Sequence, residues 1–175
     1  DAILSVAPYY NKPGQRGIFS HFKAISACSP LPVIIYNVPG RTACNISSDT
    51  CLELAHECEN IIGVKEASGD IAQIMRIIKG KPDNFLVISG DDMFTIPVIA
   101  AGGSGVISVL ANAYPSECSE IVSNAMKGNF KTARELHFRF IEAVELLFTA
   151  GNPSGVKAFM SLMNLCQNNL RLPLV

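Results

Sequence analysis

The stretch that decides the fold is Ile61 to Ser68, which reads IIGVKEAS. Its short β-branched beginning, bounded by polar residues, is typical of a buried strand in a parallel sheet. Lys65 would then lie at the carboxyl end of that strand, among apolar neighbours. A desolvated lysine gives up its proton more easily and can act as an amine nucleophile. A structural ion pair with a carboxylate is the competing interpretation of Lys65.

The composition is that of a globular chain. It has 175 residues, of which 49% are hydrophobic and 17% charged, and its formal net charge is −1. We expect neither a nucleic-acid nor a membrane partner, because the sequence has no basic stripe and no apolar run of spanning length. The six cysteines form no CxxC pair, which favours free thiols in a reducing cytosol over a zinc site. The first residues lack the charged segment of a secretory signal.

Strand and helix patterns alternate on both sides of this stretch. Strands are predicted at 2–7, 33–36, 61–64, 85–89 and 104–110, and helices at 15–27, 48–55, 71–78 and 93–101. In the helix at 71–78, Ile71, Ile74, Met75 and Ile78 are expected on one face. Beyond Pro115 the pattern predicts helices alone, at 115–127, 130–148 and 153–164. Alternation with short connections predicts βαβ units and a parallel sheet.

Two α/β architectures fit this alternation, an open doubly wound sheet and a (β/α)8 barrel. Tyr10, Tyr36, Lys65 and Asp91 each follow a different predicted strand, and barrels build their sites from such strand ends. We therefore favour a TIM barrel. Because a barrel has eight strands, about three βα units are expected to be missing before the first one. Residues 1–114 would form the partial barrel, and residues 115–175 its last helix and a C-terminal helical segment.

Such an incomplete barrel would have two open edges. Val33, Ile35, Val64 and Val87 are expected to face its interior and to lack packing partners on the absent side. The chain by itself should therefore be unstable as a monomer.

Several motifs have both a chemical and a structural interpretation. YNVPGRT, residues 36–42, could bring a phenol and a guanidinium together over one pocket, or hold a structural tyrosine beside a surface arginine. SGDD, residues 89–92, could bind a metal, although helix capping by Asp91 or Asp92 is favoured. GGSGV, residues 102–106, precedes a strand, which argues against a phosphate site. The histidines, His21, His56 and His137, are expected at the surface.

Five motifs follow one another in a fixed order: PYYNKP, YNVPGRT, GVKEASGD, SGDD and GGSGVISV. In this combination the chain resembles the dihydrodipicolinate synthase / N-acetylneuraminate lyase family of class I aldolases over essentially all its residues. Arg41 favours the synthase branch, because the sialic acid lyases generally lack an arginine there. A sugar-acid aldolase of the same family and an inactive fragment remain the alternatives.

The resemblance implies a lyase that needs no cofactor or metal. Lys65 would form a Schiff base with pyruvate, and the resulting enamine would attack L-aspartate 4-semialdehyde to give 4-hydroxy-tetrahydrodipicolinate in lysine and diaminopimelate biosynthesis. Tyr36 would relay protons, and Tyr10 would extend the relay into a neighbouring subunit's site. The implied assembly is a cytoplasmic homo-oligomer, a dimer of dimers.

The resemblance also assigns substrate-binding residues. Arg41 would orient the semialdehyde carboxylate, Ile107 would present its main-chain carbonyl near the lysine, and Gly90 would shape the pocket loop. A GTTGE-like segment, from which the family takes a relay threonine, is absent from this sequence.

Overall fold

The computed structural model describes residues 1–175. They form two compact units, Asp1–Ile107 and Ser108–Val175. The boundary expected from the sequence, after residue 114, lies within the second unit. Each unit is described by itself below.

The first unit is a parallel sheet with helices. Its strands are β1 (Ile3–Val6), β2 (Val33–Asn37), β3 (Ile61–Glu66), β4 (Leu86–Ser89) and β5 (Gly105–Val106). Its helices are α1 (Gln15–Cys28), α2 (Pro39–Thr42), α3 (Ser48–Glu57), α4 (Ile71–Gly80) and α5 (Thr95–Ala100). The expected five strands and their parallel pairing are confirmed, although β5 is much shorter than predicted.

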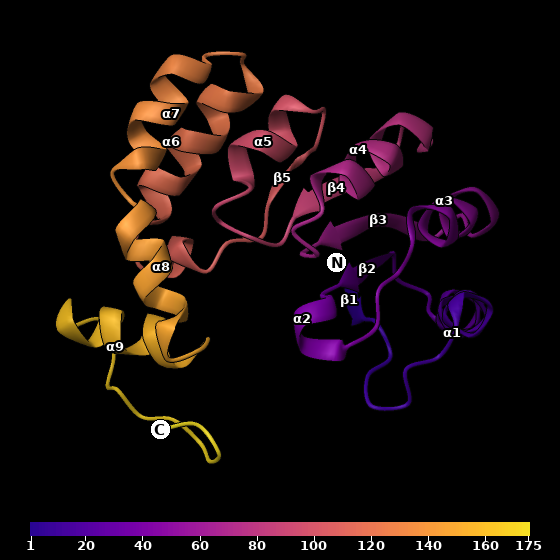
Figure 1. The fold of residues 1–175 in the computed structure, drawn as a ribbon, viewed down its shortest axis with the longest axis horizontal. Coiled ribbons are helices and arrows are strands. Elements are labelled where there is room, and N and C mark those ends of the chain that lie inside the picture. Colours follow the sequence, from indigo (N-terminus) through magenta and orange to yellow (C-terminus); the bar gives the residue numbers. More distant parts are fainter. The chain divides into compact units, whose positions relative to one another are not determined.

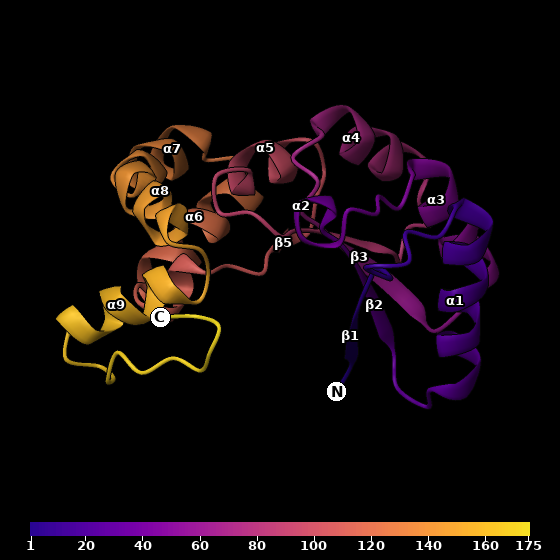
Figure 2. The same cartoon turned by 60° about the horizontal axis from the view of Figure 1, so that its bottom comes forward.

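The order of the strands separates the two architectures. Neighbouring strands follow the chain, β1-β2-β3-β4-β5, with no reversal (Figure 1). A doubly wound sheet changes direction at a switch point and has helices on both faces. Here α1, α3, α4 and α5 follow one another along one side of the sheet (Figure 2). Sequential strands with helices on one side are the arrangement of a barrel segment.

Local capping explains where the main helices begin. Ser47 Oγ accepts the Thr50 N–H at 3.2 Å at the start of α3. Asp70 Oδ1 accepts the Gln73 N–H at 3.0 Å at the start of α4. Each cap satisfies a backbone donor that the helix leaves unpaired.

The core lies between the sheet and the helices. Val33, Ile35, Val64 and Val87 are all 0% exposed and belong to one cluster with Ile18, Phe22, Leu54, Ile74 and Ile77. The prediction that these four strand residues face the barrel interior is therefore wrong. Side chains alternate along a strand, and the opposite face carries exposed residues such as Leu4, Val6 and Leu86.

The phase of α4 also differs from the prediction. Met75 is 54% exposed, whereas Ile77 is fully buried together with Ile74. The apolar residues lie on one side of this helix, and Ile71 and Ile78 also pack on the core, but the buried side is turned away from Met75 toward Ile77. Packing against the sheet selects the face that holds Ile74 and Ile77.

Gly63 lies where β3 and β4 approach closely, and Gly63→Ala is expected to destabilise the protein. A Cβ there would be 2.7 Å from Leu86 O and 2.9 Å from Leu86 Cβ. Forcing the strands apart should cost roughly 1–3 kcal/mol of unfolding free energy, measured by urea denaturation. Gly40→Ala is the control, because a Cβ at Gly40 meets nothing within 4 Å. Equal unfolding midpoints for the two variants would show that β3 and β4 are not held at this close distance by Gly63.

The second unit is helical. It contains a 3-10 turn, η1 (Leu110–Asn112), and helices α6 (Pro115–Met126), α7 (Phe130–Phe138), α8 (Ile141–Thr149) and α9 (Ser154–Leu162). The prediction of one long helix over 130–148 is wrong, because Arg139 and Phe140 separate α7 from α8. Buried Phe140 packs on the Tyr114 ring, with 5.0 Å between centroids. His137 is buried rather than at the surface.

None of the helices combines the length and the apolar character that crossing a membrane requires.

Candidate active site

Lys65 and Tyr36 lie side by side at the carboxyl ends of β3 and β2. The two residues are partners in the register of the parallel pair. Both side chains are on the sheet face opposite the helices, because their neighbours in sequence face the core. The Lys65 Nζ lies 4.2 Å from the centroid of the Tyr36 ring. Contact with the face of an aromatic ring helps to hold the lysine head group in place.

The surroundings of Lys65 make its ammonium group easier to deprotonate. Burial lowers the pKa of Lys65, the Asp92 carboxylate raises it, and the Arg41 guanidinium lowers it again, with the net shift downward. Burial raises the pKa of Tyr36, and Arg41 opposes this rise. At neutral pH the pair therefore combines a lysine that deprotonates more easily than usual with a phenol that keeps its proton.

Asp92, for which the sequence suggested helix capping or metal binding, belongs to the surroundings of Lys65. Its side chain is buried and acts on Lys65 through its charge. The prediction that Asp91 or Asp92 caps the next helix is wrong, since Phe94 holds the N-cap position of α5 without a side-chain bond. Asp91 Oδ1 instead accepts the Met93 N–H at 2.9 Å within the preceding turn. The signal in the sequence for its role is its place just after β4, the strand that pairs with the lysine strand β3.

Gly90 packs directly against the lysine. A Cβ at this position would lie 3.1 Å from Lys65 Cε and 2.8 Å from Ala67 Cβ. The Gly90 N–H donates to the Glu66 carbonyl at 2.7 Å, which fixes the backbone at that distance. Gly90 thus leaves the space that the lysine side chain occupies.

Arg41 belongs to α2, a single helical turn that follows β2. Thr42 Oγ1 donates to the Val38 carbonyl at 3.1 Å and accepts the Cys44 N–H at 3.2 Å, which closes this turn. The exposed Arg41 side chain is near enough to shift the pKa values of both Lys65 and Tyr36. The guanidinium is therefore close enough to the phenol and the amine to act on both through its charge.

The two other predicted site residues lie at strand ends. Ile107 directly follows β5, and its N–H donates to the Ser89 carbonyl at 2.9 Å. Tyr10 lies in the loop after β1, is 89% exposed and has φ +66°. Of the predicted residues, the structure thus joins Lys65, Tyr36, Arg41 and Gly90 by direct contacts or charge, and leaves Tyr10 facing outward.

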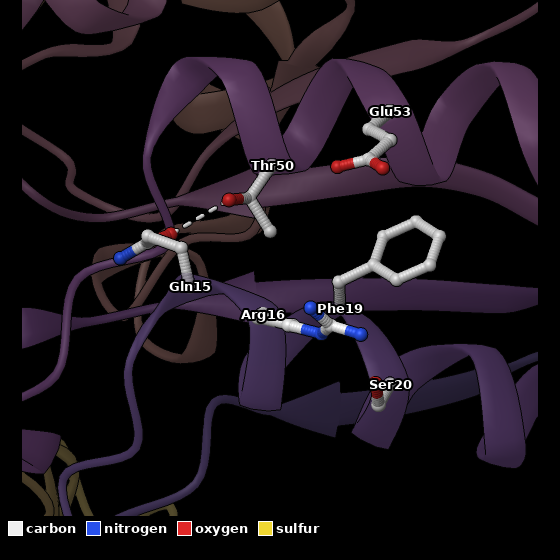
Figure 3. Close-up of a pocket in the computed structure, with 6 residues that line it drawn as sticks. All are labelled: Gln15, Arg16, Phe19, Ser20, Thr50 and Glu53. Atoms are coloured by element: carbon white, nitrogen blue, oxygen red, sulfur yellow. Dashed lines mark hydrogen bonds between the residues drawn. The ribbon is translucent and has the colours of Figure 1, made fainter.

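A separate groove of about 500 Å³ lies on the helical side, between α1 and α3 (Figure 3). Gln15 Oε1 accepts hydrogen bonds from Thr50 Oγ1 at 2.8 Å and from the Ser47 N–H at 3.0 Å. Arg16 and Glu53 also line it. None of the residues around Lys65 lines this groove, so it is distinct from the lysine site.

Comparison with known proteins gives a consistent result. The model of the dihydrodipicolinate synthetase family matches residues 1–175. Over 174 residues the chain is 53% identical to 4-hydroxy-tetrahydrodipicolinate synthase of Flavobacterium psychrophilum, covering 99% of this chain and 59% of that protein. The same enzyme of Phocaeicola vulgatus is 54% identical over 175 residues, covering 100% and 59%.

Solved structures agree in fold. Dihydrodipicolinate synthase from Aquifex aeolicus has a TM-score of 0.96 at 44% identity, covering 98% of this chain and 59% of that one. The chloride-inhibited enzyme from Acinetobacter baumannii, solved with pyruvate, has a TM-score of 0.96 at 40% identity, covering 100% and 60%.

The chain spans about 59% of the length of these curated relatives. Its five strands therefore form part of a (β/α)8 barrel, as the sequence predicted. With the family model matched from the first residue to the last, and with Lys65 beside Tyr36 at the strand ends, the chain belongs to the dihydrodipicolinate synthetase family.

Proposed function

We propose that this chain carries the lysine site of an enzyme that condenses pyruvate with L-aspartate 4-semialdehyde. The product is 4-hydroxy-tetrahydrodipicolinate, on the route to diaminopimelate and lysine. The observation that carries the proposal is the half-buried Lys65 amine, with its lowered pKa, lying over the Tyr36 ring. The relatives named as this synthase, and the one solved with pyruvate, support it.

The chemistry begins with a neutral amine. Lys65 Nζ attacks the ketone carbon of pyruvate, and the carbinolamine loses water to form an iminium. The positive nitrogen makes the adjacent methyl group acidic, so loss of a proton gives an enamine. The enamine carbon attacks the aldehyde carbon of the semialdehyde, which regenerates the iminium, and the new alkoxide takes up a proton. The amino group of the semialdehyde then attacks the iminium carbon, closes the ring and expels the Lys65 amine. Tyr36, whose pKa is raised by burial, supplies and recovers protons beside the lysine.

Substrate binding falls to the residues around this pair. Arg41 orients the semialdehyde carboxylate through its planar guanidinium. Ile107 offers its main-chain carbonyl at the end of β5, and Gly90 keeps room beside the lysine. Tyr10, exposed on its loop, extends the proton relay of a neighbouring subunit in a homo-oligomer built as a dimer of dimers. The six thiols, none in a disulfide, agree with the reducing cytosol proposed as its location.

Trapping the Schiff base tests this function. Borohydride added to the enzyme with pyruvate should reduce the iminium and leave a stable pyruvyl-derived adduct. Peptide mass mapping should place this adduct on Lys65. A full-length enzyme that is labelled on another lysine, or not at all, would refute the role of Lys65.

Gly90→Ala should slow adduct formation while the fold persists. The added methyl group would lie 2.8 Å from Ala67 Cβ and 3.1 Å from Lys65 Cε, so the lysine side chain must move. A displacement of this size slows a reaction by roughly ten- to hundredfold, measured as the rate of borohydride-trapped label. Gly14→Ala is the control, because a Cβ there meets nothing within 4 Å. Equal trapping rates in both variants would show that Gly90 does not set the lysine position.

A further inference from the structure

A buried polar cluster lies behind the Lys65–Tyr36 pair. Glu66 and Asn37 follow these residues in sequence and are themselves register partners across β3 and β2. They point to the helix side of the sheet, since side chains alternate along a strand. Glu66 is 1% exposed and Asn37 0%. Burying a carboxylate is costly unless its oxygens accept hydrogen bonds, so a charge at this position calls for a reason.

The Glu66 carboxylate joins its own strand, β3, to three other segments of the chain. Both of its oxygens accept from Asn37 Nδ2 on β2, at 3.1 Å each. Oε1 also accepts the Ser68 N–H at 2.7 Å, in the turn after β3. Oε2 accepts from Gln73 Nε2 on α4 at 3.0 Å. Hydrogen bonds to a carboxylate are stronger than those between neutral groups, so this clamp is stiff.

Asn37 carries the clamp into the segment that follows β2. Its Oδ1 accepts the Ile46 N–H at 2.9 Å, and its Nδ2 donates to Asn45 Oδ1 at 2.8 Å. Asn45 Nδ2 in turn donates to Gln73 Oε1 at 2.8 Å. The segment between residues 37 and 46, which includes Arg41, is therefore tied back to β2 at its far end.

The clamp lies where the backbone ladder of the sheet ends. The Ala67 N–H donates to the Asn37 carbonyl at 2.8 Å, and the Gly90 N–H to the Glu66 carbonyl at 2.7 Å. Beyond these bonds the strands separate into loops. At this point the side-chain hydrogen bonds of Glu66 and Asn37 take over from the backbone hydrogen bonds of the sheet in holding the strand ends together.

We propose that Glu66 is a positioning residue, whose hydrogen-bonded clamp with Asn37 and Gln73 holds Lys65 beside Tyr36. The inference deepens the proposed function, because it rests on Lys65 being the reacting amine. The charges that act on Lys65 itself are those of Asp92 and Arg41. Glu66 therefore works through the geometry of the strand ends rather than through its own field at the amine.

Glu66→Gln tests the clamp, since it keeps the size of the side chain but turns an amide donor toward the donors of Asn37 and Gln73. Acetic anhydride labelling across a pH series, followed by peptide mass analysis, measures the reactivity of the Lys65 amine without pyruvate. We expect its midpoint to rise toward that of an ordinary lysine, because water reaches the released side chain. Pyruvate trapping should slow by roughly ten- to hundredfold. Glu53→Gln, in the groove of Figure 3, is the matched control and should change neither readout.

An unchanged midpoint in the folded Glu66→Gln variant would overturn the proposal. The proposal would also fail if the loss of trapping matched the fraction of the variant that is unfolded, because Glu66 would then have only a structural role. If Glu66→Gln does not fold, Gln73→Met is tested instead by the labelling midpoint and the trapping rate. This variant removes the Gln73 donor and leaves the Glu66 carboxylate in place. If wild-type Lys65 is not trapped by pyruvate, the proposed function fails, while the labelling midpoints still test the clamp.

Discussion

Pyruvate and borohydride should leave a Lys65→Arg enzyme unlabelled. A guanidinium stays protonated at any working pH and offers no free amine. Condensation of pyruvate with the semialdehyde should fall by about a thousandfold or more, since loss of a covalent nucleophile has cost about 10⁶ in a well-studied hydrolase. The measurements are intact mass after trapping and the steady-state rate of condensation.

Lys81→Arg is the matched control for this variant. Lys81 is a partly buried lysine just beyond α4, whose Nζ donates to the Pro82 carbonyl at 3.3 Å. Its replacement should leave labelling and turnover unchanged. Label that persists in Lys65→Arg would move the Schiff base to another residue.

The wild-type enzyme should also show the lowered pKa of Lys65 in its pH dependence. The amine reacts only when unprotonated, so trapping slows as the pH falls through the pKa of Lys65. Because burial and Arg41 bring this pKa below that of an ordinary lysine, trapping should persist at pH values where an exposed lysine is already fully protonated. A midpoint at the ordinary lysine value would contradict the environment described for this amine.

Arg41→Ala should weaken the use of the semialdehyde far more than the use of pyruvate. Removing a charged hydrogen bond costs roughly 1.5–3 kcal/mol, which corresponds to about ten- to a hundredfold in affinity. The expected result is a higher KM for the semialdehyde with nearly normal pyruvate trapping. Since Arg41 lowers the pKa of Lys65, its loss should also shift the trapping midpoint upward.

Arg16→Ala, in the groove between α1 and α3, is the control for loss of an exposed arginine (Figure 3). It should change neither the KM nor the midpoint. Equal damage to pyruvate trapping and to semialdehyde use in Arg41→Ala would remove Arg41 from carboxylate binding.

Much of the first unit was predictable from the sequence because its signals are local. Apolar β-branched runs, capping residues such as Ser47 and Asp70, and helical spacing mark strands and helices without reference to distant residues. The same holds for the placement of Lys65 and Tyr36 at strand ends. The sequence did not show that Met75 would be exposed, because this residue shares the apolar side of α4 with the buried isoleucines. Nor did it show that Arg139 and Phe140 separate α7 from α8, because the apolar spacing continues across them.

By itself, the sequence determined the order of strands and helices, the strand ends that carry chemistry, and the family. Tertiary structure alone decided which face of each strand is buried, and it reversed the expectation for Val33, Ile35, Val64 and Val87. It also brought Asp92 to Lys65, and joined Glu66 to Asn37 and Gln73. These contacts link residues from different elements, and their existence depends on strand register and helix packing. No local pattern encodes them, because a hydrogen bond or a charge acts across space between groups that the chain itself does not place side by side.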